Sequence, residues 1–494
     1  FSQSTKRYVG RKMNTKLKVL LVATEATPFS KVGGLADFAG SLPRELKKLG
    51  VDVMLMIPRH ESPSGQKPKV RMAFPVPLGP EDEQVHLLEA ESFQFPVYMI
   101  YHDRYFGHRN RVYGFNDDPQ RFLFFSRAVI SAVSHMNWQP DVIHVNDWHT
   151  CAIPTWIDVH GRGDQVFNDV ATVLTIHSLA YQGVCGRLLL DFGRMGQIPH
   201  LDVEAPGKVN WLAQGIEHAD VLSTVSPSYA REITTPETGG ELSTLLAERQ
   251  DQLFGILSGI DTDLWNPASD SALTQPFDMD ALHMREVNKT ALQRELQLPT
   301  HRDFPLLSMV TRLDPAKGLD LVVPALEALM HSALYQFVIL GTGREDYAHE
   351  LRSFQQCYPR NVRFINRFDE RLARRIYGGS DFFLMPSREE AISTSVMIAM
   401  RYGSVPVVRA TGGLRDVVID TTRQPERGTG FDFQPFSAEA LTRVLETAIG
   451  YRETERWFPL QRRVMKRDFS WAVAAHSYLD IYRRSVQIRM EKRV

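Results

Sequence analysis

The sequence is poor in cysteine and has no excess of charge of either sign. Its 494 residues include only Cys151, Cys185 and Cys357, and these show no Cys-x-x-Cys spacing. So sparse a set argues against a disulfide framework or a zinc cluster and favours a reducing compartment. Lys and Arg total 57 against 58 Asp and Glu, so the basic excess typical of nucleic-acid-binding proteins is missing. Any binding of anions must therefore come from local groups.

Long apolar runs and several known signatures are also absent from the sequence. No apolar run approaches the roughly 18 residues that span a bilayer, so we expect no membrane partner. Neither the Gly-x-Gly-x-x-Gly nor the Gly-x-x-x-x-Gly-Lys-Ser/Thr signature occurs, which disfavours hydride transfer and P-loop hydrolysis. No cluster of His, Asp and Glu has metal-ligand spacing, so we expect no metal.

The chain is too long for one ordinary domain, and its apolar runs alternate with helix-compatible stretches. Continuous Val, Ile and Leu runs are typical of strands buried on both faces, and alternation with helices predicts parallel sheets. Residues 1–12 carry four basic residues and no acid, and we interpret them as a tag, linker or transit remnant. The predicted strands are 18–24, 51–57, 97–101, 142–145, 173–176, 221–225, 306–311, 337–340, 362–365, 382–385 and 405–408.

A short sequence motif occurs twice in the chain, once in each half. Residues 33–37 and 412–416 both read Gly-Gly-Leu-x-Asp, and a helix-compatible stretch follows each. Two similar Rossmann-like halves would explain the repeated motif, although chance would as well. The crossing between halves is expected near 253–259. Ligands of such sheets bind beyond the carboxyl ends of the strands, which predicts a site in a cleft between the two halves.

Each glycine pair follows a predicted strand, where backbone amides can approach an anion closely. Lys31 adds a positive charge beside the first pair, and a plain strand-to-helix turn is the alternative there. A second loop carries Arg312 and Lys317, which are able to clamp a diphosphate by charge-assisted bonds. Taken singly, each of these two side chains is more often a solvated loop cation.

Three further polar residues follow predicted strands. Asp147 comes after the strand 142–145, His177 after 173–176 and Glu390 after 382–385. A carboxylate at the position of Glu390 can bond a sugar hydroxyl or stabilise positive charge near a reacting carbon. A lone histidine is more often structural, so His177 alone indicates little.

These motifs occur together and in order, and from Lys16 to about Tyr482 the chain resembles bacterial glycogen synthases and plant starch synthases of glycosyltransferase family 5. The resemblance implies an α/β GT-B fold, with two Rossmann-like domains whose parallel sheets face a central cleft. An acceptor and catalytic domain is expected over 13–252, a nucleotide-sugar domain over 258–470, and a helix over 471–494 that returns to the first domain. The motifs that carry the resemblance are 28–37, 146–149, 175–183, 224–227, 259–261, 312–318, 400–403 and 407–414.

The resemblance implies a retaining glucosyltransferase without a metal or other cofactor. It would move glucose from ADP-glucose or UDP-glucose to the non-reducing end of an α-1,4-glucan, with the leaving phosphate taking the acceptor proton. A cytoplasmic location is expected, or the plastid stroma in a plant or alga. The implied catalytic residues are His177, through its backbone carbonyl, Glu390 and Asp147. The implied donor-binding residues are Lys31, Gly33, Gly34, Arg312, Lys317, Phe368, Ser395, Thr411, Gly412, Gly413 and Leu414.

The departures from the family pattern are concentrated in the expected site. Ser178 and Ser258 stand where the family has Asn, Ile392 where it has Cys, and Glu241 where it has Gly. Phe368 replaces a Tyr that stacks on adenine. A site that loses hydrogen-bonding side chains loses discrimination for sugar hydroxyls. Three interpretations stay open: a synthase with altered or weak activity, a non-catalytic glucan-binding or scaffolding paralogue, and a transferase with a changed sugar donor. A sugar-nucleotide epimerase fits the motifs poorly.

Overall fold

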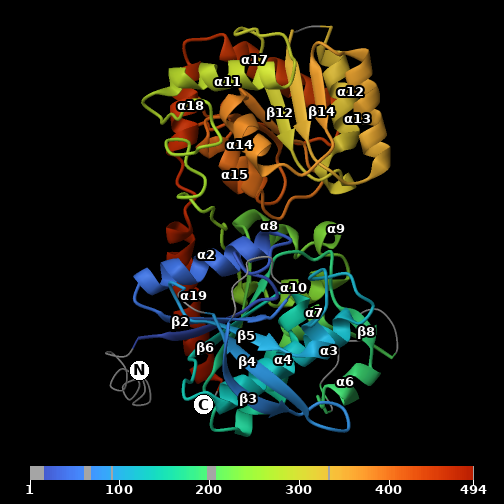
Figure 1. Ribbon diagram of the computed structural model, residues 1–494, viewed down its shortest axis with the longest axis vertical. Helices are drawn as coiled ribbons and strands as arrows, with labels where there is room; N and C mark the ends of the chain where they lie inside the picture. The colour runs from blue at the N-terminus through green and yellow to red at the C-terminus, as the bar shows by residue number, and fades with distance from the viewer. Residues whose placement is uncertain are drawn as a thin grey trace. The chain divides into compact units, whose positions relative to one another are not determined.

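The computed structural model describes residues 16–60, 68–90, 93–196, 198, 207–331 and 334–492, so the expected tag or transit remnant at 1–12 lies outside the described residues. The chain divides into two compact α/β units (Figure 1). The first comprises the chain up to Val225, Ala230–Ile256 and the chain from Trp471 on, and the second comprises Ser226–Tyr229 and Leu257–Ser470. The chain therefore leaves the first unit after Ile256 and re-enters it at Trp471.

The first unit contains a nine-stranded sheet of order β11-β10-β7-β6-β1-β2-β5-β4-β3. Strands β11 to β5 pair in parallel, whereas β4 pairs with β5 and β3 in antiparallel fashion. A separate two-stranded sheet joins β8 to β9. The strands are β1 (Lys18–Val22), β2 (Asp52–Pro58), β3 (Lys69–Val76), β4 (Glu83–Glu89), β5 (Val97–Tyr101), β6 (Val142–Asn146), β7 (Ala171–Ile176), β8 (Val184–Gly186), β9 (Lys208–Asn210), β10 (Val221–Thr224) and β11 (Leu253–Gly255).

The predicted parallel sheet of the first unit is confirmed, and it carries in addition an antiparallel edge formed by β4 and β3. Strand β3 is exposed over most of its length, and only Phe74 and Val76 are buried. Such half-exposed strands are typical of sheet edges, whereas β1 and β6 lie inside the sheet and are almost completely buried. A search for unbroken apolar runs finds the interior strands and misses β3 and β4.

Helices α2 and α19 contribute to one hydrophobic core together with alternate residues of β1 and β2. The last helix, α19, buries Trp471, Ala474, Tyr478 and Ile481, which recur at helical spacing. Phe469, two residues before this helix, packs in the core of the second unit. The helices of the first unit are α2 (Gly34–Lys48), α3 (Asp103–Phe106), α4 (Asp118–His135), α5 (Ala152–Val159), α6 (Leu188–Phe192), α7 (Trp211–His218), α9 (Pro236–Gly239), α10 (Ser243–Glu248) and α19 (Trp471–Glu491), and α8 (Pro227–Glu232) follows β10.

A buried chain of hydrogen bonds also fixes α19 to this sheet. Tyr482 Oη lies 2.8 Å from His144 Nδ1, and His144 Nε2 lies 2.6 Å from Thr175 Oγ1. The hydroxyl of Thr175 lies 2.6 Å from that of Ser223. Thr175 belongs to β7, two residues before His177, so the returning helix supports the strand that carries a predicted catalytic residue.

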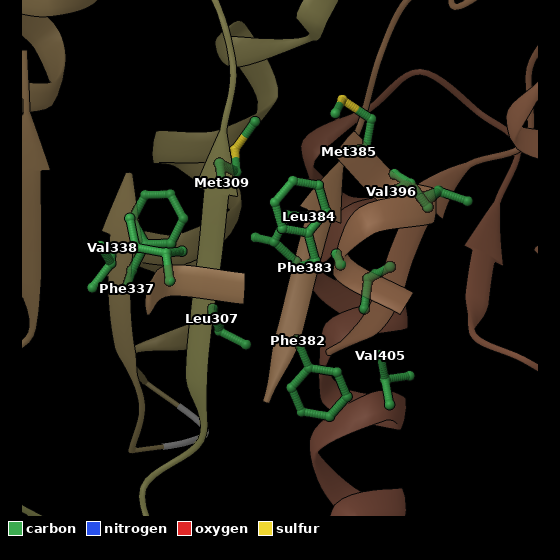
Figure 2. Packing of buried hydrophobic residues seen from close by; sticks show 14 of the residues in the cluster. Leu307, Met309, Phe337, Val338, Phe382, Phe383, Leu384, Met385, Val396 and Val405 are labelled. Atoms are coloured by element: carbon green, nitrogen blue, oxygen red, sulfur yellow. The ribbon is translucent and has the colours of Figure 1, made fainter. Parts of the chain in front are cut away.

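The second unit contains a six-stranded sheet of order β14-β13-β12-β15-β16-β17, parallel throughout. Its strands carry apolar side chains into a continuous core, and Figure 2 shows Leu307, Phe337 and Phe383 within it. Among the described residues, no helix of either unit is long and apolar enough to cross a membrane. The elements are β12 (Leu306–Val310), β13 (Gln336–Leu340), β14 (Val362–Ile365), β15 (Phe382–Met385), β16 (Val405–Arg409), β17 (Phe431–Phe433), α11 (Arg285–Glu295), α12 (Leu319–Leu329), α13 (Glu345–Cys357), α14 (Glu370–Gly379), α15 (Thr394–Arg401), α16 (Leu414–Val417), α17 (Ala438–Arg452) and α18 (Trp457–Lys466).

Candidate functional site

In the first unit, the predicted residues follow neighbouring parallel strands. Strand β1 pairs with β6, and β6 pairs with β7, so their carboxyl ends lie at one edge of the sheet. The glycine loop at 31–34 follows β1, Asp147 follows β6 and His177 follows β7. The fold thus gathers Lys31, Asp147 and His177 at the edge where doubly wound sheets bind their ligands.

The glycine loop of the first unit holds an internal carboxylate. The backbone amides of Val32 and Gly33 donate to the side chain of Glu25, with the Gly33 nitrogen 3.3 Å from Glu25 Oε1. Glu25 is buried, and that burial raises the pKa of its carboxyl group. Lys31, in contrast, is exposed and lies 2.8 Å from Asp37 Oδ1. Of the glycine pair predicted to face a ligand anion, the Gly33 amide is therefore engaged by Glu25, a residue that no sequence motif pointed to.

Asp147 has a strained backbone and a buried carboxylate. Its φ of 54° and ψ of 179° lie in a region that non-glycine residues rarely adopt. The carboxylate accepts a hydrogen bond from the backbone nitrogen of His177 at 2.7 Å, and the Ser178 amide also donates to it. Burial raises the pKa of Asp147 to about 7. This strained backbone directs the carboxylate toward the loop after β7.

The imidazole of His177 is held inside the first unit. Its Nε2 lies 2.9 Å from Asn146 Oδ1, and its ring meets Phe38 edge to face at 4.9 Å between centroids. Burial lowers the pKa of His177 to about 3, so the ring is neutral at pH 7. A neutral, enclosed ring does not supply a proton, and the expected role of the backbone carbonyl stays a prediction.

Two of the residues that depart from the family pattern, Ser178 and Glu241, also belong to the first unit. Ser178 Oγ accepts a hydrogen bond from the backbone nitrogen of Ala180 at 3.2 Å. One of its lone pairs is therefore already engaged with its own loop. Glu241 is exposed and lies in the short helix η3 (Gly240–Leu242).

In the second unit, three loops follow the neighbouring strands β12, β15 and β16. Lys317 Nζ lies 2.7 Å from Glu390 Oε2, and the hydroxyl of Ser387 donates to the same oxygen at 2.9 Å. Glu390 is only 8% exposed. A buried carboxylate with a cation and a hydroxyl on one oxygen is well fixed in position. The structure thus brings Lys317 and Glu390 together from sequence positions 73 residues apart.

Glycines allow these three loops to pack closely. Gly318 has a φ of 67°, and a Cβ there would lie 2.0 Å from the carbonyl oxygen of Pro386. Gly412 has a φ of 45°, and a Cβ there would lie 2.0 Å from the carbonyl oxygen of Glu390. The Gly413 amide donates to that same carbonyl at 2.9 Å. The loop of the second glycine pair therefore sets the backbone position of Glu390.

This packing changes the expectation for a diphosphate on the amides of 411–414. Thr411 donates its amide to Arg409, Gly413 to Glu390 and Leu414 to Thr411. These amides are thus satisfied within the unit. The prediction of diphosphate binding in this unit consequently rests on Arg312, which is exposed, and on Lys317.

The other predicted residues of the second unit differ widely in exposure. Phe368 is 88% exposed, as a stacking platform for a base would be. Ser395 lies in the first turn of α15. Ser258 is buried, and Ile392 packs against the hydrophobic core. Within the described part of the chain, no group of three or more His, Cys, Asp or Glu side chains is arranged to hold a metal ion.

Comparisons with known proteins cover nearly the whole chain. The starch synthase catalytic domain family matches residues 18–248, and the family of group 1 glycosyl transferases matches residues 294–458. Glycogen synthase 2 of Geobacter sulfurreducens is 42% identical over 96% of this chain and 100% of its own length. Glycogen synthase of Thermotoga maritima is 40% identical over 95% of this chain and 99% of its own.

A solved structure also matches nearly the whole chain. The catalytic domain of starch synthase IV from Arabidopsis thaliana, bound to ADP and acarbose, superposes with a TM-score of 0.87 and is 32% identical. The match covers 96% of this chain and 100% of that one. A sucrose-phosphate synthase from Thermosynechococcus elongatus, 18% identical with a TM-score of 0.59, shares the fold.

Proposed function

This chain belongs to the glycogen and starch synthase family of glycosyltransferases, with the two-domain GT-B fold of that family, and we propose that it transfers glucose from ADP-glucose to the non-reducing end of an α-1,4-glucan. UDP-glucose is the alternative donor. The arrangement of Lys317, Glu390 and Gly412 supports the proposal most strongly, because it places a cation and a buried carboxylate on one rigid set of loops. The ADP and the oligosaccharide analogue in the starch synthase IV structure support the choice of substrates.

In the proposed reaction, the second unit holds the donor. Arg312 and Lys317 bind its two phosphates, and Phe368 stacks on the base. Lys317 would then exchange part of its contact with Glu390 for the diphosphate. The carboxylate of Glu390 would stabilise the positive charge that develops at the anomeric carbon. The leaving phosphate would accept the proton of the acceptor hydroxyl, so that no separate side chain acts as the base.

The first unit would position the acceptor and the glucosyl group. Asp147 fixes the backbone of His177 and Ser178, and the carbonyl of His177 would face the reacting carbon. Lys31, Gly33 and Gly34 are proposed to complete the donor site. A cytoplasmic location, or the plastid stroma in a plant or alga, is part of the same proposal.

The altered residues lead us to propose slow turnover with nucleotide affinity retained. Ser178 and Ser258 reach less far than Asn and lack its paired donor and acceptor. Each lost sugar contact would cost about 1 kcal/mol in transition-state binding. The triple variant Ser178→Asn, Ser258→Asn, Glu241→Gly should therefore be faster than the natural sequence on glycogen.

The proposed function is tested by incubating the purified protein with radiolabelled ADP-glucose, UDP-glucose and other sugar nucleotides, with and without glycogen. We expect label in polymer from ADP-glucose, unchanged by EDTA, and none from the Glu390→Gln variant. Transfer from a different sugar nucleotide would favour the changed-donor alternative. Binding of glycogen and ADP without any transfer, even by the triple variant, would favour the scaffolding alternative.

A further inference from the structure

A cation-lined cavity lies in the second unit, apart from the donor residues. Its volume is about 320 Å³. It lies beside the C-terminal ends of α15 and α18, where Arg401 ends the first helix and Arg467 follows the second. The full lining is Ile260, Thr262, Met279, Arg401, Met465, Lys466, Arg467, Asp468, Phe469 and Ser470.

The two arginines of this cavity have buried nitrogens without a partner. The Nε atoms of Arg401 and Arg467 have no hydrogen-bond partner among the residues that the structure describes. Burial lowers the pKa of Arg467, whose guanidinium lies over the Phe469 ring at 5.3 Å from its centroid. Lys466, also in the lining, is exposed. Among the described lining residues, the one acid is Asp468, whose Oδ1 accepts from the Ser470 amide at 2.8 Å.

Two buried cations of the same unit, in contrast, have hydrogen-bond partners. Arg285 donates to the carbonyls of Tyr402 and Ser380, and Lys289 lies 2.7 Å from Asp381 Oδ2. A buried guanidinium nitrogen without a partner is costly, and a bound anion would offset that cost. The apolar side chains of Met279 and Met465 add a surface for the body of a small molecule.

We propose that this cavity, which we call the crossing pocket, binds a small phosphate-bearing anion through Arg401, Lys466 and Arg467. Two guanidinium groups suit the tetrahedral oxygens of a phosphate, and the volume accommodates a small phosphomonoester. The backbone nitrogen of Ile260 donates to the carbonyl of Phe469 at 2.8 Å, so the pocket adjoins the segments after Leu257 and before Trp471.

The crossing pocket is also connected to the donor residues through α15. This helix carries Ser395 in its first turn and Arg401 at its last residue. A ligand on Arg401 is therefore placed at the far end of an element that begins beside Glu390. Any coupling of the two ligands would be reciprocal in their binding free energies.

Isothermal titration calorimetry tests the proposal on the full chain, with EDTA and saturating ADP present. The probes are inorganic phosphate and glycerol 2-phosphate, which distinguish a free phosphate from a phosphomonoester. We expect one site in the natural protein and binding at least about tenfold weaker in Arg401→Gln with Arg467→Gln, because charge-assisted bonds are lost. The matched control is Arg462→Gln on the same α18, whose side chain is exposed and pairs with Asp280.

Binding by Arg462→Gln equal to that of the natural protein, with loss in the double variant, supports the crossing pocket. No heat from either probe at millimolar concentration, or equal binding by the double variant, would overturn it. If the double variant does not fold, as judged by its thermal transition, Lys466→Gln gives the same test at an exposed position. A protein that fails to bind ADP refutes the proposed donor site alone, because the comparison of variants still reports on this pocket.

Discussion

The candidate site residues of the two units differ in the groups that their side chains contact. In the first unit, polar groups satisfy one another: Glu25 occupies the glycine-loop amides, and Asp147 holds the amide of His177. In the second unit, Arg312 is exposed, and the Lys317 ammonium is paired with the buried carboxylate of Glu390. We propose that the first arrangement fixes a backbone for a neutral sugar and that the second offers charge to an anion. On this proposal, donor affinity depends mainly on the second unit, and geometry at the acceptor side on the first.

The largest effect is expected from adding a methyl group to a glycine loop, and it should differ between the two units. Gly412→Ala would place a Cβ 2.0 Å from the carbonyl oxygen of Glu390, at a φ of 45°. We expect the Glu390 backbone to shift and the transfer rate to fall by about 10²-fold or more. Gly34→Ala is the counterpart in the first unit and should cost less, because nothing in the protein lies within 4 Å of a Cβ there and only a contact with the bound donor is at risk. Steady-state rates with ADP-glucose and glycogen measure both, and an equal loss in the two variants would refute the difference.

The buried acid of the first unit gives a pH dependence of stability. Because the pKa of Asp147 is raised from 3.8 to about 7, the folded state binds more protons than the unfolded state between these values. Asp147 therefore stabilises the fold least above pH 7, and its contribution grows as the pH falls toward 4, by at most a few kcal/mol. His177 acts in the opposite direction, since its pKa is lowered to about 3.

Comparison with Asp147→Asn isolates that contribution. Denaturant unfolding of both proteins at pH 5 and pH 8 gives the free energy of unfolding at each pH. The natural protein should gain stability relative to the variant on going from pH 8 to pH 5. A difference between the two proteins that does not change with pH would show that Asp147 titrates normally.

A smaller effect, on the free energy of unfolding, is expected from the buried hydrogen-bond chain that joins α19 to the sheet of the first unit. Tyr482→Phe removes the hydroxyl that lies 2.8 Å from His144 Nδ1 in a fully buried network. Leaving that ring nitrogen unpaired should lower the free energy of unfolding by about 1–3 kcal/mol. The affinity for ADP should not change, because the donor residues of the second unit are untouched. Urea denaturation and nucleotide titration on the same preparation check both statements.

The sequence predicted the interior of both sheets well and the site only in part. Each predicted run coincides with a strand, because a strand buried on both faces must be apolar throughout. Lys317 and Glu390 were recognised because loops after parallel strands share one edge. Glu25 was missed, since nothing in its local sequence shows that its carboxylate reaches the amides of Val32 and Gly33. The strain at Asp147 is likewise imposed by contacts distant in sequence, here with the loop after β7.

The assignment of donor affinity to the second unit is tested most directly by titrating ADP in EDTA into the natural protein and single Lys→Ala variants. Lys317→Ala should weaken binding by about 1.5–3 kcal/mol, because a charge-assisted contact to phosphate is lost. Lys31→Ala should cost less, since Lys31 is exposed and already paired with Asp37. The control Lys48→Ala, which removes an exposed pair with Glu45, should bind as the natural protein does. Unchanged affinity in Lys317→Ala, or binding that requires Mg²⁺, would contradict the account.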